Sequence, residues 1–310
     1  MIHTVTLNPA IDKTLIVGDL KKGEVNRILD SREDVGGKGI NVSKVLKALG
    51  TRSISTGILG KDNSKFFLNY LTKSGIDTNF YTISGENRTN IKIVEKNSGI
   101  FTDINDKGFE IGMKDLDKFL SYFLFFVKKG DIVVVSGSLP KGVKDSSYGY
   151  IIEKLKQKGA KVILDADGKP LLKGIKSIPY AIKPNINELK SIVEIDENDI
   201  NSILKGGKYL VDNGIKKVLI SLGDKGAIYI TENNSLFSKS FNVPVKSTVG
   251  AGDSMVAALV YAINNKLNDF DTLKLAMACA TAKIMTEGTE KPNIDLIKKI
   301  EKDVEIKSLL

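Results

Sequence analysis

The chain has 310 residues and a formal net charge of +9 at pH 7. Hydrophobic residues make up 42% of it, which favours a folded protein with a sizeable core over a disordered one. The single cysteine, Cys279, excludes an internal disulfide framework. No apolar run is long enough to span a membrane, and the start lacks the basic region of a secretion signal. We therefore predict a cytoplasmic protein without membrane partners. The positive charge comes mainly from lysines spread along the whole chain, which is typical of a solvated surface and argues against a nucleic-acid partner.

The first third of the chain alternates short strands with helices. Period-two and apolar runs predict strands over 2–7, 14–17, 24–32 and 51–59. A glycine-rich segment, 36–39, opens a helix that runs through Leu49 with apolar residues at helical spacing, and a second helix is predicted over 63–74. Alternating runs at 90–95 and 100–104 surround a turn at 96–99 and predict a hairpin.

From residue 114 onward, helices alternate with strands that are apolar on both faces. The pattern predicts helices over 114–128, 146–158 and 199–213, each followed by a strand, over 131–136, 160–165 and 217–222. A hairpin over 227–237 and helices over about 251–265 and 269–286 complete the chain. Such alternation indicates a parallel sheet covered on both sides. We therefore predict one α/β domain over 1–310, with a mostly parallel central sheet, helices on both faces and a small β-sheet lid formed by about 11–35 and 87–107.

One segment near the end of the chain carries the clearest chemical signal. Residues 247–254 combine two glycines, Gly250 and Gly252, with the start of a helix. The glycines let the backbone approach a ligand, and the helix N-terminus offers free N–H groups and a positive dipole end. This combination suits the charge that develops on a phosphoryl group during its transfer. Asp253, in the first turn, either stabilises the helix as a capping acid or acts as a general base on a hydroxyl, and the segment alone leaves both open.

Six motifs place that segment in a wider pattern. They are, in chain order, 8–12, 36–42, 136–140, 183–188, 221–223 and 248–254. In this order and spacing the chain resembles, almost end to end, the ribokinase-like (phosphofructokinase-B) family of sugar kinases. The resemblance implies a ribokinase-like fold, ATP and Mg²⁺ as cofactors, and transfer of the γ-phosphate of ATP to a sugar hydroxyl. A requirement for a monovalent cation is left open.

The resemblance also implies roles for matching positions. Asp253 matches the family's catalytic base. The backbone N–H groups of its anion hole, which hold the transition-state charge, match Gly250, Ala251 and Gly252. The sugar contacts match Asp12, Gly37 and Asn41. From the residues alone, Asp12 could equally cap a turn after Pro9.

Nucleotide and metal positions match in the same way. Asn185 and Glu188 match the motif that organises Mg²⁺ and its waters, and their oxygens suit that hard cation. The positions implied to bind the nucleotide are Lys183, Asn185, Ser221, Gly223, Gly226 and Gly252. Gly223 and Gly226 could instead serve a hairpin turn.

Three cations distinguish the chain from kinases of free sugars. Lys38 lies inside the first glycine motif, and Arg27 and Arg88 lie in the two lid segments. Three cations at one pocket suit a substrate that already carries a phosphate. The stretches 23–27, 88–92 and 101–105, which include Asn90 as a further substrate contact, are most similar to the branch of the family that phosphorylates fructose 1-phosphate to fructose 1,6-bisphosphate. The branch that acts on tagatose 6-phosphate is the next most similar.

Other classes fit less well. The Gly250–Gly252 segment lacks the third glycine of a dinucleotide fingerprint and lies late in the chain, and there is no P-loop motif. A non-catalytic sugar-phosphate sensor is the alternative of another class, although it would need neither Asp253 nor Glu188. Two β segments that stand off an α/β body would expose an apolar face and strand edges, so we predict a homodimer through the lid.

Overall fold

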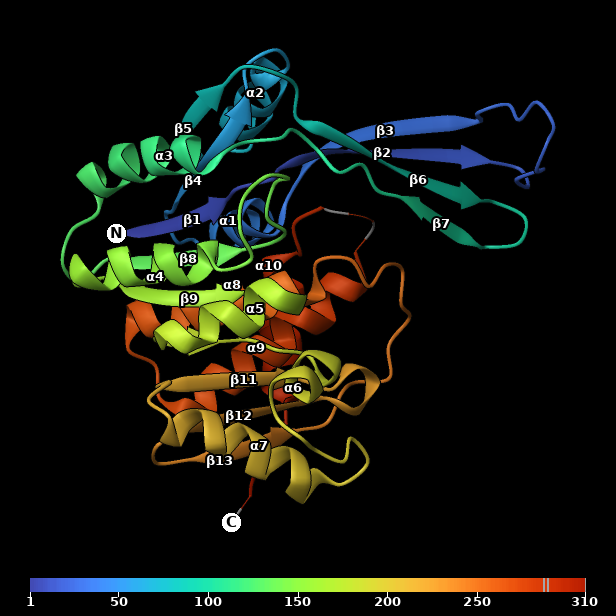
Figure 1. Cartoon of the computed structure of the whole chain (residues 1–310). Helices are drawn as coiled ribbons and strands as arrows, with labels where there is room; N and C mark the ends of the chain where they lie inside the picture. Colours follow the sequence, from blue (N-terminus) through green and yellow to red (C-terminus); the bar gives the residue numbers. More distant parts are fainter. Residues whose placement is uncertain (287, 289, 310) are drawn as a thin grey trace.

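The computed structural model describes residues 1–286, 288 and 290–309, and its centre is a ten-stranded sheet (Figure 1). Pairing is parallel from β5 through to β11 and antiparallel from β11 to β14. In sheet order the strands are β14 (Lys307–Ser308), β13 (Ser235–Ser238), β12 (Ala227–Thr231), β11 (Lys217–Ser221), β10 (Ala181–Ile182), β9 (Lys161–Asp165), β8 (Ile132–Ser136), β1 (Ile2–Thr6), β4 (Ile54–Gly60) and β5 (Asp77–Ile83). The predicted mostly parallel sheet is confirmed.

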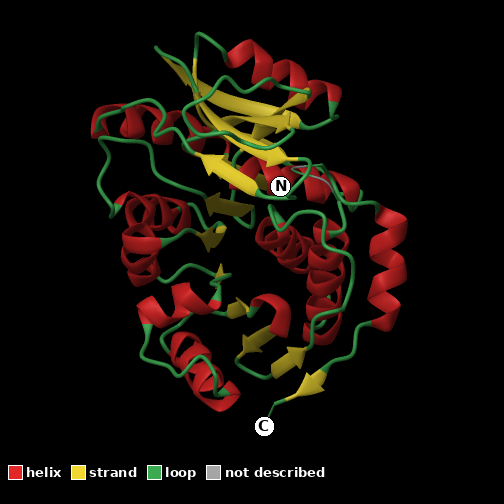
Figure 2. Cartoon of the chain, turned by 90° about the vertical axis from the view of Figure 1, so that its right-hand side faces the viewer, coloured by secondary structure: helices red, strands yellow, loops and turns green. Residues whose placement is uncertain are grey.

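Helices cover both faces of this sheet, as Figure 2 shows. One face carries α1 (Lys38–Ala48), α8 (Ala251–Asn265), α9 (Asp269–Ile284) and α10 (Ile294–Asp303). The other carries α3 (Met113–Phe126), α4 (Ser147–Gln157), α5 (Gly168–Gly174), α6 (Ile186–Ile192) and α7 (Ile200–Asp212). A smaller cluster joins α2 (Ser64–Lys73) to its neighbouring strands. The prediction of helices on both faces is therefore confirmed.

The central strands show why the sequence folds this way. Every residue of β8 is buried, and its side chains alternate between the two cores. Val133 and Val135 pack on one face, whereas Ile132 and Val134 pack on the other, as the two-residue period of a strand requires. A strand that is apolar on both sides is stable only between two helical layers. In the part of the chain that the structure describes, no helix is long and apolar enough to cross a membrane.

A second, four-stranded sheet stands away from the body of the protein (Figure 1). Its order is β3 (Asp30–Gly36), β2 (Ala10–Val17), β6 (Arg88–Glu95) and β7 (Phe101–Ile104). These strands come from the two segments predicted to form a small separate sheet. In the parallel pair of β2 and β6, Asp12 lies opposite Asn90, so the sheet brings together two residues that are 78 positions apart in the sequence.

The structure corrects several boundaries. The strand predicted over 24–32 starts only at Asp30, and residues 24–29 form a loop in which Val25 is 86% exposed. Alternation without a partner strand does not make a strand. The prediction also missed β5, α5, α6, β10 and α10. The strand β5 is only half-buried at the sheet edge, and α5 and α6 have seven residues each, too few to display a helical period.

Candidate functional site

A cavity of about 510 Å³ lies where the second sheet faces the carboxyl ends of the central strands. Crevices at this edge are the usual ligand sites of open α/β sheets. Thirteen of the residues predicted from the sequence line it, namely Asp12, Gly37, Lys38, Asn41, Arg88, Asn90, Lys183, Asn185, Glu188, Ser221, Gly250, Gly252 and Asp253. The fold therefore brings residues from Asp12 to Asp253 to one cavity. Their presence there does not by itself assign a role to each residue.

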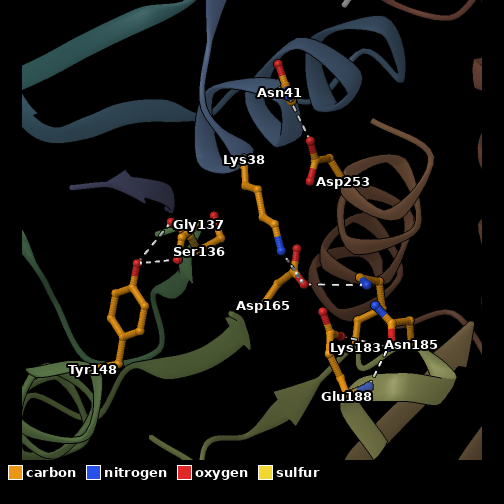
Figure 3. Close-up of polar contacts among 10 residues, drawn as sticks. All are labelled: Lys38, Asn41, Ser136, Gly137, Tyr148, Asp165, Lys183, Asn185, Glu188 and Asp253. Atoms are coloured by element: carbon orange, nitrogen blue, oxygen red, sulfur yellow. Dashed lines mark hydrogen bonds and ion pairs between the residues drawn. The ribbon is translucent and has the colours of Figure 1, made fainter. Parts of the chain in front are cut away.

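Asp253 is a buried acid of the cavity with a raised pKa. It lies in the first turn of α8, after the N-cap residue Gly250, and is 6% exposed. Its Oδ2 accepts a hydrogen bond of 2.8 Å from Asn41 Nδ2 of α1 (Figure 3). Burial, reinforced by the negative charge of Asp165, raises the pKa of Asp253 to about 6 against the opposing effect of Asn41 and two lysines. Asp253 thus lines the cavity with a pKa above that of an ordinary aspartate.

The turn before Asp253 depends on glycine. Gly250 has a φ of +80°, in the left-handed region, and caps the N-terminus of α8. Gly250 and Gly252 both line the cavity, whereas Ala251 does not, and its N–H is directed at the carbonyl of Thr248 at 3.4 Å. The helix N-terminus thus presents a positive dipole end to the cavity beside a buried carboxylate.

A charged network that the sequence analysis missed lies beside this helix. Asp165, the last residue of β9, is 1% exposed and lies between two ammonium groups (Figure 3). Its Oδ1 is 3.4 Å from Lys183 Nζ and 3.5 Å from Lys38 Nζ. Burial alone would raise the pKa of Asp165, but the two lysines outweigh it and lower that pKa. The signal for Asp165 was its position, an acid at the carboxyl end of a buried parallel strand.

The same network of charges sets the pKa of Lys38. Burial acts to lower its pKa, but Asp165, Asp253 and Glu188 together raise it, so Lys38 stays charged. Its ammonium group is therefore already paired with a carboxylate.

Asn185 and Glu188 form a reciprocal capping box at the start of α6. The Asn185 N–H donates to Glu188 Oε2 at 2.7 Å, and the Glu188 N–H donates to Asn185 Oδ1 at 2.9 Å (Figure 3). The arrangement satisfies two backbone donors and fixes both side chains at the cavity wall. Burial raises the pKa of Glu188, partly offset by Lys183.

Within the described residues, no three or more His, Cys, Asp or Glu side chains are grouped to hold a metal ion. Magnesium in kinases needs only one or two protein carboxylates, because substrate phosphates and water complete its coordination. Glu188 uses Oε2 in its own cap and lines the cavity, so its second oxygen fits that requirement. Asn185 Oδ1 already accepts a hydrogen bond, which favours Glu188 as the metal-binding partner of the two.

The far wall of the cavity belongs to the second sheet. Asn90 Nδ2 donates to Asp12 Oδ1 at 2.9 Å, and burial raises the pKa of Asp12. A Cβ atom on Gly36 would overlap the Asp12 carboxylate. Gly36, the first residue of the motif 36–42, therefore leaves the space that this carboxylate occupies. The strand pairing and the glycine thus orient Asp12 toward the cavity.

Arg88 lines the same wall. Its Nη2 donates to the carbonyl of Asn8 and its Nη1 to that of Asp106, both at 3.1 Å. Lys92, which the sequence analysis did not select, also lines the cavity and lies 3.5 Å from Asp103. Its signal was its place two strand positions after Asn90, on the same face of the sheet.

Besides Ala251, three predicted residues lie outside the cavity lining. Arg27 is exposed in the loop between β2 and β3 and does not line the cavity. Gly223 and Gly226 flank a short turn between β11 and β12 and also lie outside its lining. At Gly226 a Cβ atom would collide with the Ser238 carbonyl, so this glycine is required by the approach of β13. The hairpin-turn interpretation accounts for Gly226 without a ligand.

Several known sugar kinases resemble this chain. Residues 5–296 match the pfkB family of carbohydrate kinases. The chain is 36% identical over 306 residues to the 1-phosphofructokinase of Haemophilus influenzae, covering 98% of this chain and 97% of that protein. It is 35% identical over 296 residues to the 1-phosphofructokinase of Escherichia coli, covering 94% and 95%. The crystal structure of phosphofructokinase-2 from Escherichia coli in complex with potassium matches with a TM-score of 0.92 at 25% identity, covering 97% of this chain and 98% of that one.

Proposed function

The chain belongs to the pfkB family of carbohydrate kinases, and on that premise we propose that it transfers the γ-phosphate of ATP to the C6 hydroxyl of fructose 1-phosphate. The product is fructose 1,6-bisphosphate. Full-length similarity to two 1-phosphofructokinases supports the sugar. The observation that carries the chemistry is the buried Asp253 carboxylate, which faces the cavity at the N-terminus of α8. A cytoplasmic location, where ATP and sugar phosphates occur together, belongs to the same proposal.

Asp253 takes the proton of the attacking hydroxyl in this proposal. With a pKa of about 6 it is mostly ionised at pH 7, yet more basic than an ordinary aspartate. Asn41 holds the carboxylate by its 2.8 Å hydrogen bond and so selects the oxygen that faces the substrate. The backbone N–H groups of the Gly250–Gly252 turn then stabilise the negative charge that builds up on the transferring phosphoryl group.

ATP lies along the carboxyl ends of β9 to β11. Lys183 is buried and cavity-facing, and it supplies a fixed positive charge near the phosphates. Ser221 lines the same region, and Gly223 with Gly226 forms the outer turn at the nucleotide edge. Mg²⁺, when bound, supplies charge neutralisation on the phosphates, and Glu188 is the residue that would hold it through its second oxygen. The potassium in the crystal of the Escherichia coli phosphofructokinase-2 supports testing a monovalent cation as well.

The existing phosphate of the sugar binds at the second sheet. Arg88 and Lys92 line that wall, and Asp12 with Asn90 provides partners for the sugar hydroxyls. Lys38 was expected to bind the same phosphate, but its ammonium group is already paired with Asp165 and is less available for that role. A free sugar would leave Arg88, whose guanidinium donates to backbone carbonyls, without a phosphate partner.

We include a homodimer formed through the second sheet in the proposal. Val25 in its loop and Phe101 and Ile104 in β7 are large apolar side chains that are more than half exposed. Monomers rarely leave such a group of residues open to water. Arg27 lies in the same loop and outside the cavity, so it reaches a sugar phosphate only when the loop or a second subunit brings it there.

Product identification tests the proposal. The protein is incubated with ATP, Mg²⁺ and fructose 1-phosphate, and the reaction is followed by phosphorus NMR. We expect a new phosphate ester on C6, formed at the rate at which ADP appears. Release of inorganic phosphate alone, or no reaction with any sugar phosphate, would contradict it and favour the sugar-phosphate sensor.

A further inference from the structure

Lys283 is a buried lysine next to the candidate anion hole that the proposed chemistry does not use. It lies in the last turn of α9, is 3% exposed, and its Nζ donates to the Gly288 carbonyl at 2.6 Å. A Cβ atom on Gly250 would lie 3.0 Å from Lys283 Cε and 3.9 Å from Asp253 Oδ2. The lysine side chain therefore packs directly against the glycine that starts α8, on the side where the candidate base lies.

The end of α9 also supports the segment that leads to Gly250. The N–H groups of Lys246 and Ser247 donate to the Ile284 carbonyl at 2.8 Å and 3.2 Å. Lys283 and Ile284 are neighbours, so one end of α9 contacts the glycine turn through a side chain and the segment before it through a carbonyl. A substitution at Lys283 should therefore alter the backbone position at the N-terminus of α8.

A positive charge at this place is physically unfavourable in the unliganded protein. The N-terminus of α8 carries a positive dipole end and burial removes the hydration of the ammonium group, whereas the C-terminal end of α9 favours a cation there, and burial has the larger effect. The charged groups that influence Lys283 are Glu290, Asp253 and Asp34, which are negative, and Arg32 and Lys44, which are positive. Burial has the largest effect and lowers the pKa of Lys283 to about 8. The buried ammonium group of Lys283 lowers the stability of the unliganded protein. It becomes favourable when the transferring phosphoryl group brings negative charge to this place.

Resting on the proposed kinase function, we propose that Lys283 is the resident cation of the anion hole. Its ammonium group positions Gly250 and strengthens the positive end of α8, so that catalysis needs no added monovalent ion. Lys283 is a positioning residue in this role, because it acts through the backbone of α8 and not by touching the substrate. The residues proposed to bind the sugar phosphate group, Arg88 and Lys92, lie on the second sheet, so the KM for the sugar phosphate should not depend on Lys283.

The first test compares Lys283→Met with Lys274→Met, a control on the same helix. We expect Lys283→Met to lower kcat about 10- to 30-fold, the value of a partly buried charge at a helix terminus, with an unchanged KM for the sugar phosphate. Lys274→Met should keep wild-type kcat. Lys283→Arg keeps the charge and should keep more activity than Lys283→Met. Equal kcat in Lys283→Met and wild type would overturn the proposal, as would a drop in Lys283→Arg as large as in Lys283→Met when both variants unfold at the wild-type temperature.

The second test separates charge from packing. In Lys283→Ala, methylammonium or potassium should restore at least about a third of the lost activity, and neither should change the Lys274→Met control. Wild-type activity should be equal in potassium, sodium and choline chloride, and kcat/KM should fall above about pH 8 as Lys283 loses its proton. A folded Lys283→Ala that no cation rescues, or a wild type that needs potassium, would overturn the role.

These outcomes are separable from a failure of the proposed function. The variant ratios and cation effects are measured with whichever sugar phosphate wild type accepts best. If fructose 1-phosphate is not that substrate, the proposed sugar is wrong and the Lys283 ratios still decide this inference. If wild type accepts no sugar phosphate, both proposals are contradicted together.

Discussion

Replacing Asn41 by alanine should move the acid limb of the pH–rate profile to higher pH. The Asn41 amide donates a 2.8 Å hydrogen bond to the Asp253 carboxylate, and this bond favours the ionised form. Hydrogen bonds to charged groups are worth about 1.5–3 kcal/mol, and each pKa unit corresponds to about 1.4 kcal/mol. Loss of the bond should therefore raise the pKa of Asp253, already about 6, by about one to two units.

The sign follows from the role of a base. Asp253 accepts a proton only when ionised, so activity is present above its pKa and is lost as the pH falls through it. The assay is kcat/KM for the sugar phosphate from pH 5 to 9, with Asn265→Ala as a control at the other end of α8. Phosphate groups of the substrates also titrate near pH 6, so the pH midpoint of the wild-type profile alone is not informative. The test is the difference in that midpoint between Asn41→Ala and the control. An Asn41→Ala profile that overlays the control would refute the reasoning.

Further predictions concern the other groups of the cavity. Asp253→Asn should lower kcat by about 10²–10⁴-fold while calorimetry still detects binding of ATP, and retention of more than about a tenth of kcat would remove it as the base. Glu188→Gln should raise the Mg²⁺ concentration needed for half-maximal rate without unfolding α6, because glutamine also completes a capping box; unchanged Mg²⁺ dependence would remove Glu188 from the metal site. Asp165→Asn should lower the free energy of unfolding in urea by about 3–5 kcal/mol, because Lys38 and Lys183 would lose their buried partner, and a loss below about 1 kcal/mol would count against that network. Arg88→Ala should raise KM for fructose 1-phosphate about tenfold or more and KM for ATP by less than about twofold, with Arg88→Lys intermediate because lysine lacks the planar fork; equal effects on both substrates would place Arg88 outside the sugar site.

Much of the fold could be predicted because its core strands carry an unambiguous signal. Strands such as β8 are buried at every position, apolar from Ile132 to Val135, and alternate with amphipathic helices, and a parallel sheet between two helical layers buries both of their faces. The chain failed to reveal elements whose stability comes from their neighbours. β5 is half-buried and polar, and it forms because β4 supplies its hydrogen bonds.

The site divides along the same line. Motif residues such as Asp253 and Glu188 could be selected from the sequence, because the resemblance to the sugar kinase family covers the motifs that contain them. Asp165 could not, since its importance comes from two lysines that lie 127 and 18 positions away along the chain and meet it only in the fold. Arg27 shows the opposite error. Its position in a segment of the second sheet suggested the cavity, but the loop places it in solvent.

The most direct test of the central claim is a comparison of kcat/KM across four acceptors, measured by ADP release at fixed ATP and Mg²⁺. The acceptors are fructose 1-phosphate, tagatose 6-phosphate, fructose 6-phosphate and free fructose. The account predicts the highest value for fructose 1-phosphate, and a value at least about 10²-fold lower for free fructose, which offers Arg88 no phosphate partner. An equal or higher value for tagatose 6-phosphate would contradict the sugar assignment, and a preference for free fructose would contradict the phosphate-binding role of that sheet.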